Sequence, residues 1–392
     1  MPPPPAHSDS AETVIVGMSG GVDSAVAALL LRDAGFSVQG LFMSNWEEDG
    51  DSYCTAAEDF QDARAVCDTL GIALHRVSFS AEYRERVFAR FLREYAAGRT
   101  PNPDVLCNRE IKFGVCLEYM HRLGADRIAT GHYARLDHGT AGTRLLKGRD
   151  QSKDQSYFLH GVRPSALAKT LFPLGELSKV EVRRRAHAAG LSRVSDKPDS
   201  TGICFIGERP FQEFLGRHLE DRAGPIETPE GRLLGEHRGL AFYTLGQRSG
   251  LGVGGKAGAA EAPWYVADKD ASRNALIIVQ DHEHPLLMSD AFDVDEAHWL
   301  AGAAEAEFEC AVKTRYRQGD LGCRVLVQPG DRVQVSLRRP ARAVTPGQYA
   351  VFYDGDICLG GGVIAARRNT SSAAARGGHT VSSNSLFSLE GS

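Results

Sequence analysis

Two cysteines and one turn rich in serine and glycine are the parts of this sequence best suited to chemistry. The turn spans residues 19–24, Ser-Gly-Gly-Val-Asp-Ser, and Cys107 and Cys204 lie in two later loops. Glycine lets the backbone approach a phosphate closely, and a thiolate is a strong nucleophile. We therefore expect an anion-binding turn together with two candidate sulfur nucleophiles.

The turn joins a predicted buried strand to a predicted helix. Residues 14–16 are β-branched and uncharged, whereas residues 25–31 have helix-forming composition. With glycines at positions 20 and 21, successive N–H groups and the helix N-terminus can point at an anion. Ser19 and Ser24 add hydroxyl donors. An ordinary glycine-containing turn is the alternative, but the unit SGGxDS is much rarer than such turns.

No lysine follows these glycines, which separates the turn from the P-loop pattern GxxxxGK[ST]. SGGVDS instead resembles the loop of ATP pyrophosphatases, which cleave ATP to AMP and pyrophosphate while adenylating a substrate oxygen. A later run does match GxxxxGK, from Gly250 to Lys256, but Ala257 replaces the Mg²⁺-binding hydroxyl residue. No clear strand precedes that run and no helix follows it, so we reject it as a phosphate site.

Cys107 follows a proline-stiffened loop and lies at the predicted start of a helix. The helix dipole and the nearby Arg109 and Lys112 would favour thiolate over thiol. A small buried residue packing under the loop is an equally weighted alternative. Cys204 lies between two glycines in residues 199–207. Two thiols at the rim of an ATP site would allow one to carry sulfur and the other to assist or resolve by thiol–disulfide exchange.

The overall composition excludes several classes of protein. The chain has 392 residues, 42% of them hydrophobic, which predicts two or three domains. Lys plus Arg number 45 against 50 Asp plus Glu, so any RNA contact must be a local patch. The eight cysteines form no CxxC pair, and we predict no protein-built metal site. Without an apolar span or a signal peptide, we expect a cytoplasmic protein with no membrane contact.

Changes in residue pattern along the sequence predict several domains. Glycine- and proline-broken pieces at residues 224–238 and 240–255 are β-like, and alternating runs at residues 290–365 predict a small antiparallel barrel or sandwich. That last module carries arginines with an interleaved tyrosine, which suit RNA phosphates. The predicted parts are a disordered stretch 1–11, a catalytic domain 12–211, a central linker domain 212–288, a β-barrel 289–367 and a disordered tail 368–392.

Several motifs together carry a resemblance to one enzyme family. They are SGGVDS, LCNREIKF, ATGHYA, KDQSYFL, DSTGICFIG, YTLGQR and GQYAVFYDGD. Taken together over residues 12–366, they are similar to those of the tRNA-specific 2-thiouridylases, which exchange oxygen for sulfur at position 2 of the wobble uridine. The resemblance implies an α/β fold, with an N-terminal parallel-sheet domain of the adenine-nucleotide α-hydrolase type, a small mixed central domain and a C-terminal antiparallel β-barrel.

The resemblance also implies a set of site residues. ATP, bound with Mg²⁺, would contact Gly17, Met18, Ser19, Gly20, Gly21, Val22, Asp23, Ser24, Met43 and Gly131. The target base would meet Asn102, Pro103 and Asp104, with Cys107 as nucleophile, Cys204 as persulfide carrier and Asp104 as a plausible proton shuttle. Further tRNA contacts would come from His132, Lys153, Asp154, Gln155, Arg315, Tyr316 and Gln348.

The expected partners are tRNA and a sulfur-donor protein, and we expect a monomer. The sequence leaves two sulfur-transfer routes open, a transient disulfide between Cys107 and Cys204 or liberated hydrosulfide. It also leaves two alternative functions, another ATP pyrophosphatase-type ligase and a non-catalytic tRNA-binding protein. No glutaminase half is recognisable, and an amidotransferase-type ligase would leave both loop cysteines without a role.

Overall fold

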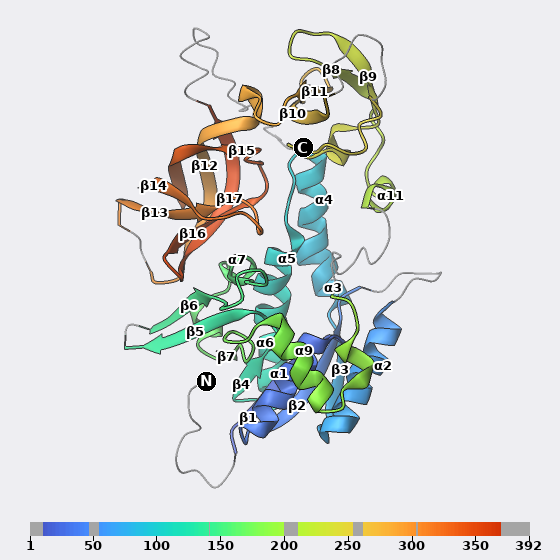
Figure 1. Cartoon of the computed structure of the whole chain (residues 1–392), viewed down its shortest axis with the longest axis vertical. Coiled ribbons are helices and arrows are strands. Elements are labelled where there is room, and N and C mark those ends of the chain that lie inside the picture. Colours follow the sequence, from blue (N-terminus) through green and yellow to red (C-terminus); the bar gives the residue numbers. More distant parts are fainter. Residues whose placement is uncertain are drawn as a thin grey trace, which may run out of the picture.

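The computed structural model describes residues 11–46, 55–140, 142–199, 211–253, 262–302 and 305–369. Figure 1 shows an N-terminal α/β part, a small central sheet and a C-terminal barrel. The predicted fold class is confirmed. Among the residues described, no helix is long and apolar enough to cross a membrane.

The N-terminal part is built on a five-stranded parallel sheet. Its first strand, β1, is buried on both faces, because Val14 and Val16 pack into one apolar cluster and Ile15 packs into another. The strands follow the order β3-β2-β1-β4-β7, with bounds β1 Thr13–Met18, β2 Ser37–Ser44, β3 Leu74–Ser78, β4 Arg127–Ala129 and β7 Thr170–Leu171.

Helices cover both faces of this sheet. Apolar residues on the Val14 side come from α1 (Val22–Asp33), α2 (Thr55–Leu70), α9 (Lys179–Ala188) and α10 (Ser192–Ser195). The Ile15 side is covered by α3 (Ser80–Tyr83), η1 (Arg84–Phe88), α4 (Ala89–Ala96), α5 (Pro103–Leu106), η2 (Cys107–Val115) and α6 (Cys116–Arg122), with α7 (Ser156–Leu159) and α8 (Pro164–Leu167) nearby.

Local features shape two of these helices. Helix α9 begins at Lys179, because Ser178 and Glu181 form a capping box. The helical stretch from Ser80 to Ala96 contains a π-helical turn, η1.

The C-terminal barrel is closed by six antiparallel strands. β12 pairs with both β15 and β17, so the ring runs β12-β15-β14-β13-β16-β17. The predicted hairpin of the N-terminal part, β5 (Ala134–Gly139) and β6 (Gly142–Lys147), extends this sheet, since β6 pairs with β17. The barrel strands are β12 Met288–Trp299, β13 Glu307–Lys313, β14 Leu321–Gln328, β15 Arg332–Arg342, β16 Tyr349–Asp354 and β17 Ile357–Arg368.

The central part is a mixed four-stranded sheet in the order β10-β11-β8-β9. The expectation of β-like pieces at residues 240–255 is wrong for the described residues 240–253, which contain a 3-10 turn, η3, and no strand. Phe242 is buried in this turn, so tertiary packing decides the local structure there. The elements are α11 Phe211–Gly216, β8 Gly224–Glu227, β9 Leu233–His237, η3 Leu240–Phe242, β10 Trp264–Asp270, β11 Ala275–Gln280 and η4 Pro285–Leu287.

We predict that Phe352→Ala destabilises the barrel by about 3–5 kcal/mol, because its fully buried ring stacks on Trp299 and would leave a cavity. Leu326→Ala is the matched control, since that side chain on β14 is 40% exposed and should cost no more than about 0.5 kcal/mol. Urea unfolding followed by tryptophan fluorescence measures both. Equal losses for the two variants would contradict the described core.

Candidate functional site

The turn between β1 and α1 has room only for glycine at its tightest point. Gly20 has φ +74°, and a Cβ there would lie 2.3 Å from the Asp59 carbonyl oxygen. The Ser19 N–H donates to Ser24 Oγ at 3.1 Å, and the Ser24 hydroxyl donates to the Gly21 carbonyl at 3.0 Å. The α1 N-terminus is capped by Gly21 with no side-chain hydrogen bond. The turn is thus a closed loop whose helix N-terminus can receive an anion.

Strand register brings Met43 and Gly131 to the same edge as the turn. Met18 at the end of β1 pairs with Phe42, one residue before Met43, and Val16 pairs with Ala129 of β4. A Cβ at Gly131 would lie 2.7 Å from the Asp23 backbone, so the residue must be glycine for the turn to pack there. Met43 is half-buried against the larger core.

Two lysines surround the turn. Lys179 Nζ lies 2.7 Å from Asp23 Oδ1 and 2.7 Å from Asp199 Oδ1. Lys197 Nζ donates to the Gly20 carbonyl at 3.2 Å and to Asp59 Oδ1 at 2.7 Å. Both ammonium groups are therefore placed to meet phosphate at the turn.

Neither lysine is among the residues that the sequence analysis predicts to contact ATP. A lysine shortly before the Cys204 loop was the available signal for Lys197.

Asp199 ties the turn to the residues that precede Cys204. Burial would raise its pKa, but hydrogen bonds from Lys153 and Lys179 hold the pKa of Asp199 at about 2. The carboxylate therefore stays charged near neutral pH and fixes this point of the chain beside the turn. Cys204 itself lies outside the described residues.

The segment that carries Cys107 begins with a capped helix. Asn102 Oδ1 accepts the N–H of Asp104 at 3.1 Å, and Pro103 occupies the first helical position. Cys107 is 2% exposed and lies in the main apolar cluster. Arg109 Nε donates to Glu110 Oε1 at 2.8 Å, so its charge has a partner. That the nearby cations favour the thiolate stays a prediction.

Asp104 and His132 have perturbed protonation. Burial raises the pKa of the Asp104 carboxyl, and Lys112 acts in the opposite direction. Burial lowers the pKa of His132 well below its usual value, and Lys112 lowers it further. The imidazole is therefore neutral, hydrogen-bonded to Thr130 Oγ1 at 2.7 Å. A carboxyl with a raised pKa suits proton transfer, whereas a neutral buried imidazole suits positioning.

Three of the residues predicted to contact tRNA form hydrogen bonds within the N-terminal part. Lys153 Nζ donates to Asp199 Oδ2 at 2.6 Å, and Gln155 Oε1 accepts the N–H of Tyr133 at 3.0 Å. Asp154 is 4% exposed and accepts the N–H of Gly148 at 3.0 Å. These three side chains make internal bonds.

Arg315, Tyr316 and Gln348 also make internal contacts. Arg315 Nη2 donates to the carbonyls of Leu245 and Ala343, at 3.1 and 2.7 Å. The Tyr316 ring lies 4.4 Å from that of Phe158, and its hydroxyl reaches the Lys153 carbonyl at 3.5 Å. Gln348 Nε2 donates to the Thr100 carbonyl at 2.8 Å. The structure brings Lys153 and Tyr316 together, while Arg315 and Gln348 lie at other junctions.

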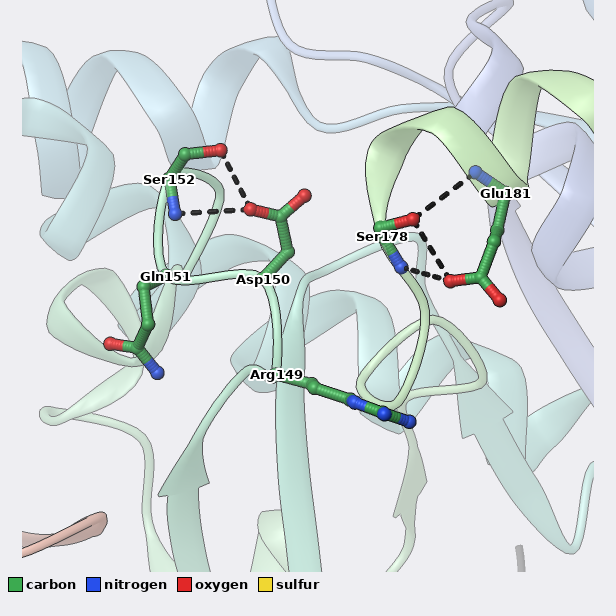
Figure 2. Close-up of a pocket in the computed structure, with 6 residues that line it drawn as sticks. All are labelled: Arg149, Asp150, Gln151, Ser152, Ser178 and Glu181. Atoms are coloured by element: carbon green, nitrogen blue, oxygen red, sulfur yellow. Dashed lines mark hydrogen bonds between the residues drawn. The ribbon is translucent and has the colours of Figure 1, made fainter.

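An open depression of about 520 Å³ lies beside the turn, between residues 149–152 and the start of α9. Figure 2 shows that its polar groups bond to one another, Ser152 to Asp150 and Ser178 to Glu181. The Asp150 carboxylate also accepts the Lys179 N–H at 3.0 Å. The bonds from Ser178, Glu181 and Asp150 cap the N-terminus of α9. We assign no ligand to the depression.

A glycine-containing turn between a parallel strand and a helix, with glycine at the end of the facing strand, is the arrangement of a nucleotide-binding α/β domain. Family models match in three successive parts, described as tRNA methyl transferase HUP domain (residues 12–208), tRNA methyl transferase PRC-barrel domain (212–280) and aminomethyltransferase beta-barrel domain (289–364).

Curated relatives identify the family. The tRNA-specific 2-thiouridylase MnmA of Chromohalobacter salexigens is 58% identical, covering 92% of this chain and 94% of that protein. The protein of the same name from Methylococcus capsulatus is 58% identical, covering 90% of this chain and 95% of that protein. The one from an Escherichia coli strain is 56% identical, covering 91% of this chain and 98% of that protein. The chain belongs to the tRNA-specific 2-thiouridylase family.

We predict that Lys179→Met lowers ATP affinity at least tenfold, or about 1.4 kcal/mol, because the ammonium group beside Asp23 is lost. Arg184→Met is the matched control, since Arg184 is an exposed cation on the same helix. Isothermal titration with ATP measures both, and thermal unfolding checks that both fold. Equal affinity in the two variants would remove Lys179 from the nucleotide site.

Proposed function

We propose that this chain is a tRNA-uridine 2-sulfurtransferase that uses ATP to replace the 2-oxygen of the wobble uridine with sulfur. The observation that carries the proposal is the 56–58% identity, over nearly the whole length, to proteins named tRNA-specific 2-thiouridylases. The turn at residues 17–24 and the two cysteine motifs supply the chemistry such an activity needs.

In this proposal residues 17–24, Met43 and Gly131 bind ATP, and the 2-carbonyl oxygen of uridine is adenylated. The turn N–H groups and Lys179 stabilise the pyrophosphate that leaves. Oxide is a poor leaving group, so conversion of the carbonyl oxygen into part of AMP makes substitution at carbon possible.

The nucleotide would bring Mg²⁺ with it. Within the described residues, no group of three or more His, Cys, Asp or Glu side chains could hold a metal. The turn supplies one carboxylate, Asp23, whose present partners are Lys179 and Tyr133. A cation held by phosphates and one carboxylate fits this donor set, and Mg²⁺ there would offset charge on the pyrophosphate.

The thiols act on the activated base. In one route the outer sulfur of a Cys204 persulfide attacks carbon 2 and displaces AMP, and Cys107 then attacks Cys204 Sγ, which forms the disulfide and leaves the outer sulfur on the base. In the other route Cys107 attacks the persulfide first, which forms the same disulfide and liberates hydrosulfide, and the hydrosulfide attacks carbon 2 and displaces AMP. Asn102 and Pro103 meet the base, and Asp104 moves the proton. The raised pKa of Asp104 supports this last role, because its carboxyl can hold a proton closer to neutral pH than an ordinary aspartate can.

The remaining roles follow the same proposal. The chain acts as a cytoplasmic monomer that accepts sulfur from a donor protein, with a catalytic domain at 12–211, a linker domain at 212–288 and a tRNA-contacting barrel at 289–367. The tRNA contacts are His132, Lys153, Asp154, Gln155, Arg315, Tyr316 and Gln348.

We predict that Cys204→Ser and Cys107→Ser each abolish 2-thiouridine formation, because each removes a thiol that the transfer requires. A single-turnover reaction with tRNA, ATP and a sulfur donor, read by mass spectrometry of the nucleosides, measures this. Cys310→Ser is the matched control and should thiolate at the parent rate, because Cys310 lies on barrel strand β13.

Two results would overturn the proposal. Thiolation by Cys204→Ser at the parent rate would remove the persulfide role. A product heavier by a methyl group, about 14 Da, instead of the about 16 Da of an oxygen-to-sulfur exchange would favour the methyl transfer that the family-model descriptions name.

A further inference from the structure

The connection between α4 and α5, residues 97–102, receives bonds from both C-terminal parts of the chain. From the central part, Lys269 Nζ on β10 donates to the Gly98 carbonyl at 2.9 Å. Thr244 Oγ1 lies 3.4 Å from Thr100 Oγ1. Gly98 follows directly on the end of α4, where a cation also meets the negative end of the helix dipole.

The barrel holds the same connection from another side. The Thr100 N–H donates to the Pro346 carbonyl at 3.0 Å, and Gln348 Nε2 donates back to the Thr100 carbonyl at 2.8 Å. Gly347 lies between these two bonds with φ +91°, and a Cβ there would lie 2.8 Å from the Thr100 nitrogen. The barrel backbone at Gly347 therefore lies so close to Thr100 that only glycine fits at position 347.

Lys269 is half-buried on β10, and burial lowers the pKa of Lys269 to about 8. Because its ammonium group has lost part of its hydration, the bond to the Gly98 carbonyl compensates for that loss. Lys269 and Thr244 are not among the residues predicted to contact ATP or tRNA.

The connection leads straight into the residues assigned to the reaction. Asn102 caps α5 by accepting the Asp104 N–H, and Cys107 follows at the end of that helix. We propose that Lys269, Thr244 and residues 346–348 are positioning residues, which hold the α4–α5 connection so that Asp104 and Cys107 lie in reacting geometry. The inference rests on the proposed function for its kinetic consequence, whereas the held connection itself is testable without turnover.

The test is the double variant Lys269→Met with Thr244→Val, which removes both central-domain contacts and keeps side-chain size. We expect faster amide hydrogen exchange in peptides spanning residues 98–107, and a single-turnover thiolation rate at least tenfold lower at saturating ATP and tRNA. ATP and tRNA dissociation constants should change less than threefold. Lys269→Arg, which keeps a charged donor, should stay within threefold of the parent rate.

Arg90→Gln is the matched control, because the ion pair of Arg90 on α4 is with Glu296 of the barrel, at 2.6 Å, and not with residues 97–102. It should leave exchange at residues 98–107 unchanged. Unchanged exchange in the double variant would overturn the positioning role, as would a rate loss matched by an equal loss of ATP affinity. If the parent itself yields no thiolated tRNA, the proposed function fails, and the exchange data still decide the positioning role.

A second inference comes from two thiols inside the barrel. Cys310 on β13 pairs directly with Cys323 on β14, and their sulfur atoms lie 3.6 Å apart. Cys323 is fully buried and Cys310 is half-buried, so a small solute can reach the pair through Cys310. Directly opposite residues in antiparallel strands have Cα atoms about 4.5–5.5 Å apart, within the range a disulfide spans.

We infer that Cys310 and Cys323 form a peroxide-oxidisable dithiol, separate from the sulfur-transfer cysteines. The hydrogen bond to Cys323 and burial raise the pKa of the Cys310 thiol, so its reaction is slow and needs peroxide in excess. The Cys310 sulfur attacks hydrogen peroxide, giving a sulfenic acid and one water. The Cys323 sulfur then attacks the sulfenic sulfur, forming the S–S bond and releasing a second water. Two thiols and one peroxide thus yield one disulfide and two waters.

Peptide mapping after peroxide treatment and alkylation of the remaining thiols tests this inference. We expect a linked Cys310–Cys323 peptide, about 2 Da lighter than the two reduced peptides together, which dithiothreitol separates. Cys323→Ser should instead show Cys310 oxidised to sulfinic acid or alkylated. Full alkylation of both cysteines in the unfolded, peroxide-treated parent, or sulfinic acid at Cys310 beside an intact Cys323 thiol, would overturn the inference.

Discussion

The parallel pairing of β1 between β2 and β4 is the constraint on which the site depends. Because the carboxyl ends of parallel strands meet at one edge, the turn after β1, Met43 near the end of β2 and Gly131 after β4 all lie at the same edge of the sheet. Gly131 then packs on the Asp23 backbone with no space for a side chain. A slip in either register would separate the turn from the residues that shape it.

Ion pairs connect this edge of the sheet to the segment that precedes Cys204. Lys179 joins Asp23 of the turn to Asp199, the last described residue before the Cys204 loop. The Cys107 segment packs on the opposite face of the sheet, in the cluster that includes Ile15. The edge that carries the turn thus lies between the Cys107 segment and Asp199. The barrel and the central part both form hydrogen bonds to the α4–α5 connection, which precedes Asp104. All three parts of the chain therefore contact the segment that leads to Asp104 and Cys107.

Much of the fold was predictable from sequence, because its signals are local. The β-branched run at residues 14–16, the glycines after it and the alternating strands of the barrel each depend on short-range pattern. The central part was harder, since residues 240–253 form turns stabilised by burial of Phe242, which alternation does not reveal. Closure of the barrel by β12 and β17, and the addition of the β5–β6 hairpin to it, depend on contacts distant in sequence.

The same distinction applies to the candidate site. The turn and the cysteine motifs could be found because their residue types are unusual together. Lys269 could not be found, because the role of a lone lysine depends on the carbonyl or carboxylate that it contacts in the folded chain. Gln348 and Arg315 were recognised only by resemblance, and in the structure their side chains bond to backbone carbonyls of other segments.

The most direct test of the account follows the oxygen atom that ATP is proposed to activate. A tRNA carrying ¹⁸O at the 2-carbonyl of the wobble uridine is reacted in a single turnover, and the AMP formed is analysed by mass spectrometry. The account predicts AMP heavier by about 2 Da, in an amount equal to the 2-thiouridine produced. Unlabelled AMP, with the ¹⁸O retained in the tRNA or released to water, would contradict it.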